Sequence, residues 1–210
     1  MYLVKAPWFL KALYPSFTWH IKTKEKILYL TFDDGPHETA TPFVLDELKK
    51  YNAHATFFCI GKNVAAYPAI YERIRNEGHA TGNHTWHHLN GWETEDDYYI
   101  NDIKEAATCI PSDLFRPPYG RIKRSQWSKL KNQWAPNRKL NIVMWDVLSG
   151  DFDVHLQPKR CLANVLYHSK PGSIIVFHDS TKAWKSMSYA LPRMLEHFSK
   201  QGYQFKTIST

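Results

Sequence analysis

The chain has 210 residues, a length that suits one domain with a sizeable core. Hydrophobic residues make up 43% and charged residues 22% of it, close to the globular average, which argues against intrinsic disorder. The formal net charge of +7 favours anionic partners such as nucleic acid, anionic lipid or an acidic polymer, without choosing among them. The three cysteines include no C-x-x-C motif, so neither a disulfide framework nor a cysteine zinc site is expected.

Residues 1–25 are rich in apolar side chains, but Lys5 and Lys11 interrupt them. They contain neither a continuous apolar region of signal-peptide type nor an A-x-A-like cleavage site, and no stretch of the chain approaches transmembrane length. We therefore expect an N-terminal extension, residues 1–25, that packs on a domain formed by residues 26–210. A cytoplasmic location is the default expectation, with the cell envelope as the alternative, and we expect a monomer.

Short apolar runs alternate with segments of helical spacing along the chain. In chain order we expect a strand at 27–32, a helix at 41–51, a strand at 55–60, a helix at 64–76, a short strand at 79–83, a helix at 93–110, a short strand at 114–118, a strand at 141–147, a helix at 158–168, a strand at 173–177, a helix at 189–201 and a strand at 203–208. Pro192 should lie in the first turn of its helix or kink it. This alternation favours an α/β fold with a parallel sheet, either a barrel or a doubly wound sheet.

Between residues 121 and 139 the chain carries seven basic residues and no acidic one. The simplest interpretation is a solvated helix face followed by a loop, and the alternative is a docking strip for a polyanion. The basic residues are Arg121, Lys123, Arg124, Lys129, Lys131, Arg138 and Lys139.

Polar residues follow the ends of five predicted strands. They are Asp33 and Asp34 after 27–32, His84 after 79–83, Tyr119 after 114–118, Asp151 after 141–147, and His178 with Asp179 after 173–177. In a parallel α/β fold the carboxyl ends of all strands open on one face, and that face carries the active site. We therefore expect these five clusters to converge in space.

His84 and His88 are four residues apart, a spacing that on a helical turn puts both imidazoles within reach of one metal ion. Asp34 adds a carboxylate, although taken alone it is as well explained by an Asp-Asp-Gly-Pro turn. Two histidines and one carboxylate are typical of a catalytic zinc site, because they leave a coordination position open. We expect Asp34, His84 and His88 to bind a divalent metal, Zn²⁺ first, with Co²⁺, Mn²⁺ or Ni²⁺ as alternatives.

Asp33 points in a different direction from its neighbour Asp34, so it is placed to deprotonate a water molecule at the site. His178 suits a general acid that protonates a leaving amine, provided that a carboxylate keeps it protonated. Asp151 is the candidate partner of His178, and Asp179 is the local alternative. Taken alone, His178 is better explained as a hydrogen-bonded core histidine.

Arg116 precedes the stiff sequence Pro117-Pro118-Tyr119-Gly120. A bidentate ion pair from Arg116 would hold Asp33 in place and keep it ionised. The prolines stiffen the loop, so it can present a backbone N–H, that of Tyr119, to a developing oxyanion.

Five short motifs stand in a fixed order: T-F-D-D-G-P at 31–36, H-T-x-x-H at 84–88, R-P-P-Y-G at 116–120, W-D-V-x-S-x-D at 145–151 and F-H-D at 177–179. Together they resemble the NodB-homology polysaccharide deacetylases, carbohydrate esterase family 4, from about residue 26 to 210. The resemblance implies a distorted (β/α)7-type TIM-like barrel in a single domain. It also implies a metal-dependent hydrolase that removes N-acetyl groups from N-acetylhexosamine glycans of chitin-oligomer or peptidoglycan type.

The resemblance implies catalytic roles for five residues and substrate contacts for three. Many members of the family carry Trp where this chain has Phe152, which keeps an apolar wall but lacks the indole N–H. The catalytic residues are Asp33, His178, Arg116, Asp151 and Tyr119, and the substrate contacts are Pro117, Tyr119 and Phe152.

Three other functions stay open. An O-acetyl esterase of acetylxylan type lies nearest, because it hydrolyses a related bond. A non-catalytic glycan-binding module on the same fold would bind sugar without turnover. A nucleic-acid-binding protein would use the basic stretch 121–139 but would leave the metal-ligating pattern unexplained, so we expect an N-acetylated glycan as partner and no nucleic acid.

Overall fold

A computed structural model describes residues 3–134 and 140–209 of the chain. Its strands are β1 (Ile27–Asp33), β2 (Ala55–Cys59), β3 (Ala80–Asn83), β4 (Leu114–Phe115), β5 (Asn141–Ile142), β6 (Val147–Leu148), β7 (Ile174–His178) and β8 (Gln204–Phe205). Its helices are α1 (Trp8–Leu13), α2 (Ala40–Lys50), α3 (Gly61–Ala66), α4 (Pro68–Asn76), α5 (Asp96–Ala107), the 3₁₀ turn η1 (Pro118–Gly120), α6 (Arg124–Gln133), α7 (Pro158–His168) and α8 (Trp184–Lys200).

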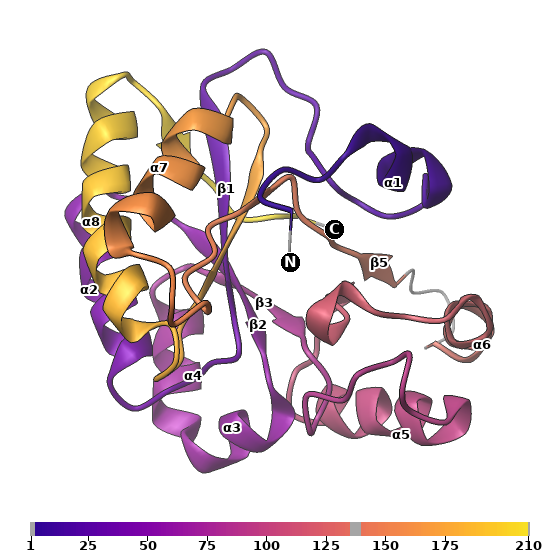
Figure 1. Cartoon of the computed structure of the whole chain (residues 1–210). Helices are drawn as coiled ribbons and strands as arrows, with labels where there is room; N and C mark the ends of the chain where they lie inside the picture. Colours follow the sequence, from indigo (N-terminus) through magenta and orange to yellow (C-terminus); the bar gives the residue numbers. More distant parts are fainter. Residues whose placement is uncertain (1–2, 135–139, 210) are drawn as a thin grey trace.

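The strands form one parallel sheet in the order β5-β4-β3-β2-β1-β7-β6, and β8 pairs with β1. The sheet curls into a half-barrel with helices around its outside, where α2, α7 and α8 pack together on one side and α5 and α6 on the other (Figure 1). This arrangement confirms the predicted distorted (β/α)7-type barrel in a single domain. Among the described residues, none forms a helix with the length and apolar character needed to cross a membrane.

Strand β1 lies inside the sheet, between β2 and β7, and every one of its residues is buried. Its Phe32 ring stacks between those of Phe57 on β2 and Phe177 on β7, with centroids 5.1 and 6.1 Å away. In the parallel register, Asp33 at the end of β1 lies beside His178 at the end of β7. The apolar core therefore sets two polar residues side by side at the carboxyl edge of the sheet.

Three predicted elements differ from the structure. The predicted helix at 64–76 is split into α3 and α4, because Tyr67 precedes Pro68 and takes an extended conformation (φ −128°, ψ 57°). The helix predicted to start at residue 189 begins at Trp184, so Pro192 lies in the interior of α8 and not in its first turn.

The strand predicted at 141–147 is also divided, into β5 and β6. The backbone carbonyls of Val143 and Met144 accept hydrogen bonds from Arg116, at 3.1 and 2.9 Å. Because these two carbonyls accept from the buried Arg116 side chain, they are not available for backbone hydrogen bonds to a neighbouring strand.

The basic stretch lies partly on α6, with Arg138 and Lys139 outside the described residues. Acidic residues at the start of α5 and just before it face this stretch. The ion pairs are Arg121–Glu93 at 3.5 Å, Lys123–Asp96 at 3.7 Å and Lys129–Asp97 at 2.5 Å. Much of its charge is therefore balanced within the molecule.

The N-terminal segment runs along the gap between β5 and β6. Thr18 bridges to Val143, and Lys5 bridges to Val147, so the segment extends the barrel wall where the two edge strands do not pair with each other. Asp146, which is completely buried, anchors the segment. Its carboxylate accepts hydrogen bonds from Lys5, Lys11 and Ser173, at 2.6, 2.6 and 2.7 Å.

We expect Asp146→Ala to lower the free energy of unfolding by about 1–3 kcal/mol, because it removes three hydrogen bonds to a buried carboxylate. Urea unfolding followed by tryptophan fluorescence measures the change. Asp97→Ala removes an exposed ion pair with Lys129 and should cost less than about 0.5 kcal/mol. Equal losses in the two variants would contradict the anchoring of the N-terminal segment by Asp146.

Candidate active site

Asp34, His84 and His88 come together beyond the carboxyl ends of β1 and β3. The Nε2 atoms of His88 and His84 lie 3.2 and 3.8 Å from the same Asp34 oxygen, Oδ1. That oxygen is buried and forms no hydrogen bond with the described residues. One ligand atom from each residue lies within 4.8 Å of the other two. A buried carboxylate oxygen that faces two imidazole nitrogens fits the coordination of a divalent cation.

His84 is held in the tautomer that a metal ligand needs. Its Nδ1 lies 2.7 Å from the backbone carbonyl of Arg116, so Nδ1 carries the proton and Nε2 keeps a lone pair facing Asp34. Burial lowers the pKa of His84 to about 4, which keeps the imidazole neutral at physiological pH. Burial alone would raise the pKa of Asp34, but interactions with His88, His178 and His84 hold it well below its usual value.

The segment 84–88 is not the helical turn that the histidine spacing suggested. Thr85 and His88 have φ angles of 65° and 60°, which are incompatible with an α-helix. Asp102 on α5 fixes this turn, because its carboxylate accepts hydrogen bonds from the backbone N–H groups of Trp86 and His87, at 2.8 and 3.0 Å. The two histidines therefore converge through a strained loop braced by a neighbouring helix.

Left-handed backbone is concentrated at this site. Of the five non-glycine residues with positive φ among the described residues, four belong to the loops that surround it: Asp34, Thr85, His88 and Tyr119. Such conformations cost of the order of 1–3 kcal/mol each and persist where the surroundings hold them, commonly at active sites. At Tyr119 the ring packs edge-on against His88, with the centroids 4.7 Å apart.

Arg116 fixes the position of Asp33. The arginine is completely buried, its guanidinium lies 4.1 Å from the centroid of the Phe58 ring, and its Nη1 donates to Asp33 Oδ1 at 2.6 Å. Among the described residues the ion pair is this single contact and not the predicted bidentate pair, because other acceptors occupy the guanidinium. They are Thr31 Oγ1, the Val143 carbonyl and the Met144 carbonyl, at 2.7, 3.1 and 2.9 Å.

Asp151 is the partner of His178, as the first of the two sequence alternatives had it. Its carboxylate accepts from both the backbone N–H and Nδ1 of His178, each at 2.7 Å. Burial alone would lower the pKa of His178, but the Asp151 carboxylate more than offsets this and raises the pKa to about 9. His178 is therefore protonated at neutral pH and can give up a proton from Nε2.

Asp179 turns away from His178 and into the loop after β1. It accepts a hydrogen bond from the Gly35 N–H at 3.1 Å and another from the Thr41 hydroxyl. Burial raises the pKa of Asp179 to about 8. This side chain thus supports the turn that carries Asp33 and Asp34.

The site opens into a cavity of about 460 Å³, here called the catalytic cavity. Arg116 and Asp151 lie buried behind its wall. Phe152 packs edge-on against His178, with the ring centroids 5.2 Å apart. Eight of the predicted site residues line the cavity: Asp33, Asp34, His84, His88, Pro117, Tyr119, Phe152 and His178.

Several residues of the catalytic cavity were not predicted. Val176 precedes His178 by two residues on β7, so strand periodicity could have placed it on the same face. Trp145 stands in the W-D-V motif, yet nothing in that motif distinguishes a cavity residue from a core residue. Lys182 lies beyond β7 with its Nζ 5.9 Å from the centroid of the Phe152 ring, and no sequence pattern marks it.

Comparisons with known proteins agree with this architecture. Residues 20–133 match the polysaccharide deacetylase family. A peptidoglycan-N-acetylglucosamine deacetylase of Bacillus cereus is 35% identical over 198 residues, covering 91% of this chain and 91% of that relative. The peptidoglycan-N-acetylmuramic acid deacetylase PdaC of Bacillus subtilis is 33% identical over 195 residues, covering 90% of this chain and 39% of that relative.

Solved structures show the same likeness. The peptidoglycan N-acetylglucosamine deacetylase Bc1960, in complex with 4-naphthalen-1-yl-N-oxidanyl-benzamide, has a TM-score of 0.86 at 31% identity, covering 97% of this chain and 95% of that chain. A family 4 acetyl xylan esterase of Clostridium thermocellum, in complex with a cobalt ion, has a TM-score of 0.76 at 28% identity, covering 87% and 88%. The chain belongs to the polysaccharide deacetylase family, carbohydrate esterase family 4, so the predicted family and enzyme class are confirmed.

We expect an NMR titration of the metal-free protein to place the pKa of His178 near 9. Asp151→Asn removes the carboxylate and leaves the effect of burial opposed only by the charges of Asp34 and Asp33, so the pKa should fall well below 9. Because the pKa is raised in the folded state, the contribution of His178 to stability is complete below about pH 6.5 and is lost as pH rises through about 9.

Asp97→Asn, which removes an exposed carboxylate paired with Lys129, is the control and should leave His178 titrating near 9. An unchanged pKa of His178 in Asp151→Asn would contradict the assignment of Asp151 as the group that keeps His178 protonated.

Proposed function

We propose that the protein is a metal-dependent N-deacetylase that hydrolyses the acetamido group of an N-acetylhexosamine glycan, with peptidoglycan-type substrates first and chitin oligomers second. The observation that carries this proposal is the combination, in one cavity, of a metal-type triad, the fixed carboxylate of Asp33 and a histidine that is protonated at neutral pH. The Bacillus cereus relative, a peptidoglycan-N-acetylglucosamine deacetylase, supports the substrate class.

Asp34, His84 and His88 would hold the divalent cation. Zn²⁺ suits two imidazoles and one carboxylate best, and Co²⁺, Mn²⁺ or Ni²⁺ are alternatives that the same ligands accept. The cation supplies Lewis acidity to water and to the acetamide carbonyl when it is bound. The cobalt ion of the acetyl xylan esterase supports metal binding on this fold without fixing the ion used here.

The other groups divide the movement of protons between them. Asp33, held by Arg116, accepts a proton from the attacking water as a bond forms between the water oxygen and the carbonyl carbon. The backbone N–H of Tyr119 donates to the oxyanion that develops on the carbonyl oxygen. His178 then protonates the nitrogen as the carbon–nitrogen bond breaks, and acetate and an amino sugar leave.

The protonated state of His178 favours an amide over an ester substrate. An amine leaves poorly unless its nitrogen is protonated, whereas an alcohol has a weaker need for an acid. The hydrogen bond to Asp151 keeps His178 protonated before the reaction begins. The O-acetyl esterase is therefore the second candidate, and the acetyl xylan esterase among the similar structures supports it. A non-catalytic glycan-binding module would have no use for the buried Arg116–Asp33 and Asp151–His178 pairs.

We expect His84→Ala to lose stoichiometric zinc, because it removes one of three ligands. Elemental analysis after dialysis against zinc measures the loss. His197→Ala is the control, since His197 is exposed on α8 and belongs to neither group of possible metal ligands among the described residues. Retention of one zinc per chain by His84→Ala would refute the ligand assignment.

Asp33→Asn should keep its zinc and lose at least about 100-fold in kcat for acetate release, the usual contribution of a general base at the low end. Asp46→Asn, which changes a carboxylate that is mostly exposed, should release acetate at the rate of the unchanged protein. Undiminished acetate release by Asp33→Asn would remove Asp33 from the reaction.

Acetate release from a panel of peptidoglycan fragments, chitin oligomers and acetylxylan, with and without a chelator, tests the function itself. We expect release from the N-acetylated glycans that a chelator abolishes and added zinc restores. Release from acetylxylan alone would replace the proposal by the O-acetyl esterase, and sugar binding without release from any substrate would favour the non-catalytic module.

A further inference from the structure

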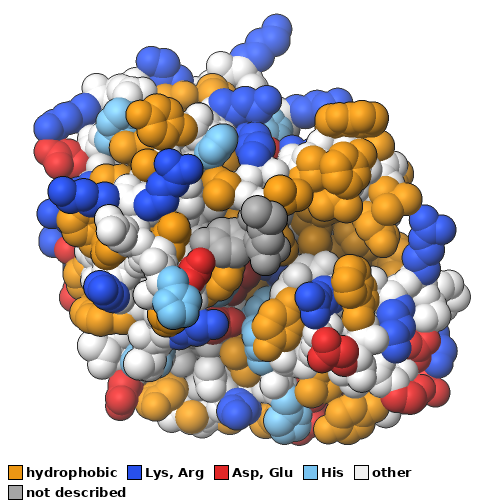
Figure 2. Space-filling model, in the orientation of Figure 1, with side chains coloured by type: hydrophobic (Ala, Val, Ile, Leu, Met, Phe, Trp, Pro, Cys, Tyr) orange, Lys and Arg blue, Asp and Glu red, His pale blue; other side chains and the backbone are white. Residues whose placement is uncertain are grey.

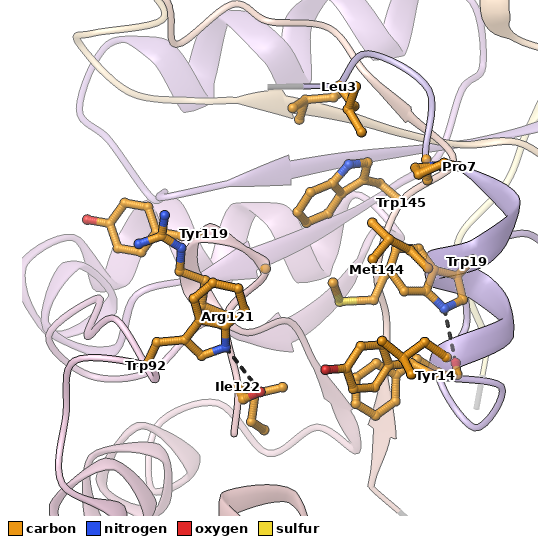
Figure 3. Close-up of a pocket in the computed structure, with 16 residues that line it drawn as sticks. Leu3, Pro7, Tyr14, Trp19, Trp92, Tyr119, Arg121, Ile122, Met144 and Trp145 are labelled. Atoms are coloured by element: carbon orange, nitrogen blue, oxygen red, sulfur yellow. Dashed lines mark hydrogen bonds between the residues drawn. The ribbon is translucent and has the colours of Figure 1, made fainter. Parts of the chain in front are cut away.

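A second cavity of about 470 Å³ adjoins the catalytic cavity, and we call it the apolar chamber. Its wall comes from the N-terminal segment, residues 3–19, on one side and from Trp92, Ile122, Met144 and Trp145 on the other. Figure 3 shows Tyr14 and Trp19 facing the group of Trp92, Arg121 and Tyr119, with Trp145 between them. Its volume lies in the range of sites for small organic ligands, about 300–1,000 Å³.

The chamber offers little to a sugar ring. Among the described residues that line it, Arg121 is the one charged residue, and its guanidinium is already stacked 5.1 Å from the centroid of the Trp92 ring. The indole N–H of Trp19 donates to the Tyr14 carbonyl at 3.2 Å, and that of Trp92 to the Ile122 carbonyl at 3.4 Å. Sugar hydroxyls buried here would exchange hydrogen bonds to water for few partners in the lining, whereas a hydrocarbon chain has none to lose.

The chamber and the catalytic cavity are neighbours. The two share part of their lining: Tyr119, Gly120, Arg121, Trp145 and Leu148. Tyr119 is the residue whose N–H we assign to the oxyanion. One ligand can therefore place its reacting group in the catalytic cavity and an apolar group in the chamber, on the two sides of these shared residues. The chamber therefore belongs with substrate recognition and not with an unrelated surface.

Exposed apolar side chains stand around the chamber among the described residues. Leu3 and Trp92 line it and are each 58% exposed. Trp8 and Phe9 on α1 stand beside it, 80% and 52% exposed. Figure 2 shows hydrophobic side chains gathered over α1 and around the hollow below it. Exposed apolar patches of this kind mark binding sites more often than ordinary surface.

We propose that the apolar chamber binds the hydrocarbon chain of an amphiphilic substrate, a lipid-linked N-acetylated glycan whose sugar enters the catalytic cavity. This inference rests on the proposed N-deacetylase function and narrows its substrate class. The chain leaves water for the chamber, and the acetamido group is thereby held beside Asp33 and His178.

The test compares two glycosides of di-N-acetylchitobiose, one n-octyl and one methyl, each below the concentration at which micelles form. We expect kcat/KM to be at least about tenfold higher for the octyl glycoside, mainly through KM, since each buried methylene contributes a factor of about four. A triethylene glycol chain of similar length should give no such gain. Equal kcat/KM for the octyl and methyl glycosides, or an equal gain from the glycol chain, would overturn the proposal.

Variants of the N-terminal segment distinguish the chamber from the surface around it. Leu10→Glu and Leu3→Glu place a charge in the chamber and should abolish the preference for the octyl chain. Trp8→Glu is the matched control, because Trp8 lies on the same helix as Leu10 but outside the chamber lining, and it should retain the preference. Because Leu3 is exposed, its variant keeps the test valid if Leu10→Glu fails to fold.

A preference lost in Trp8→Glu and kept in the two chamber variants would mean adsorption to the outer surface and would overturn the chamber assignment. If the protein sediments as a dimer and Leu3→Glu makes it a monomer, the chamber is an interface between two copies of the chain. That result would also overturn the proposal. If neither the glycosides nor the panel of glycan substrates releases acetate, the proposed function fails. Calorimetric binding of the octyl glycoside, lost in Leu10→Glu, would then still support the chamber, and its absence would overturn both.

Discussion

The buried ion pair between Arg116 and Asp33 is the interaction on which the active face depends. The guanidinium bonds Asp33 and Thr31 on β1 and the carbonyls of Val143 and Met144 beyond β5. The backbone carbonyl of the same arginine accepts the Nδ1 proton of His84. One residue therefore orients the proposed base and one of the three proposed metal ligands, and it joins both to the barrel wall. A buried charge with so many partners leaves little freedom for this face to rearrange.

Much of this arrangement could be predicted from the sequence, because it follows from strand direction. Buried apolar runs identify β1 and β7, and parallel strands place their carboxyl ends together, so Asp33 and His178 are expected to be neighbours. The conformation of 84–88 could not be predicted. The histidine spacing suggested a helical turn, but the turn is set by Asp102, which belongs to a different helix. Likewise, the break between β5 and β6 depends on hydrogen bonds from Arg116, which the local sequence pattern does not predict.

The N-terminal segment shows the same limit of local patterns. In the sequence, Lys5 and Lys11 look like interruptions of an apolar stretch. In the structure they bond the buried carboxylate of Asp146, and this contact fixes the segment against the open edge of the barrel. The apolar residues between and beside the two lysines then line a chamber next to the reaction site. A segment without a recognisable motif thus contributes to the wall of the barrel and to the shape of the space where a substrate would lie.

The proposed reaction breaks the carbon–nitrogen bond of an acetamido sugar. The most direct measurement follows free amine and acetate together during digestion of N-acetylated chitin oligomers and peptidoglycan fragments by the zinc-loaded protein. We expect one new amine for each acetate released, with the rate falling at alkaline pH as His178, whose pKa Asp151 raises, loses its proton. Acetate released without amine, or no acetate from either glycan, would contradict it.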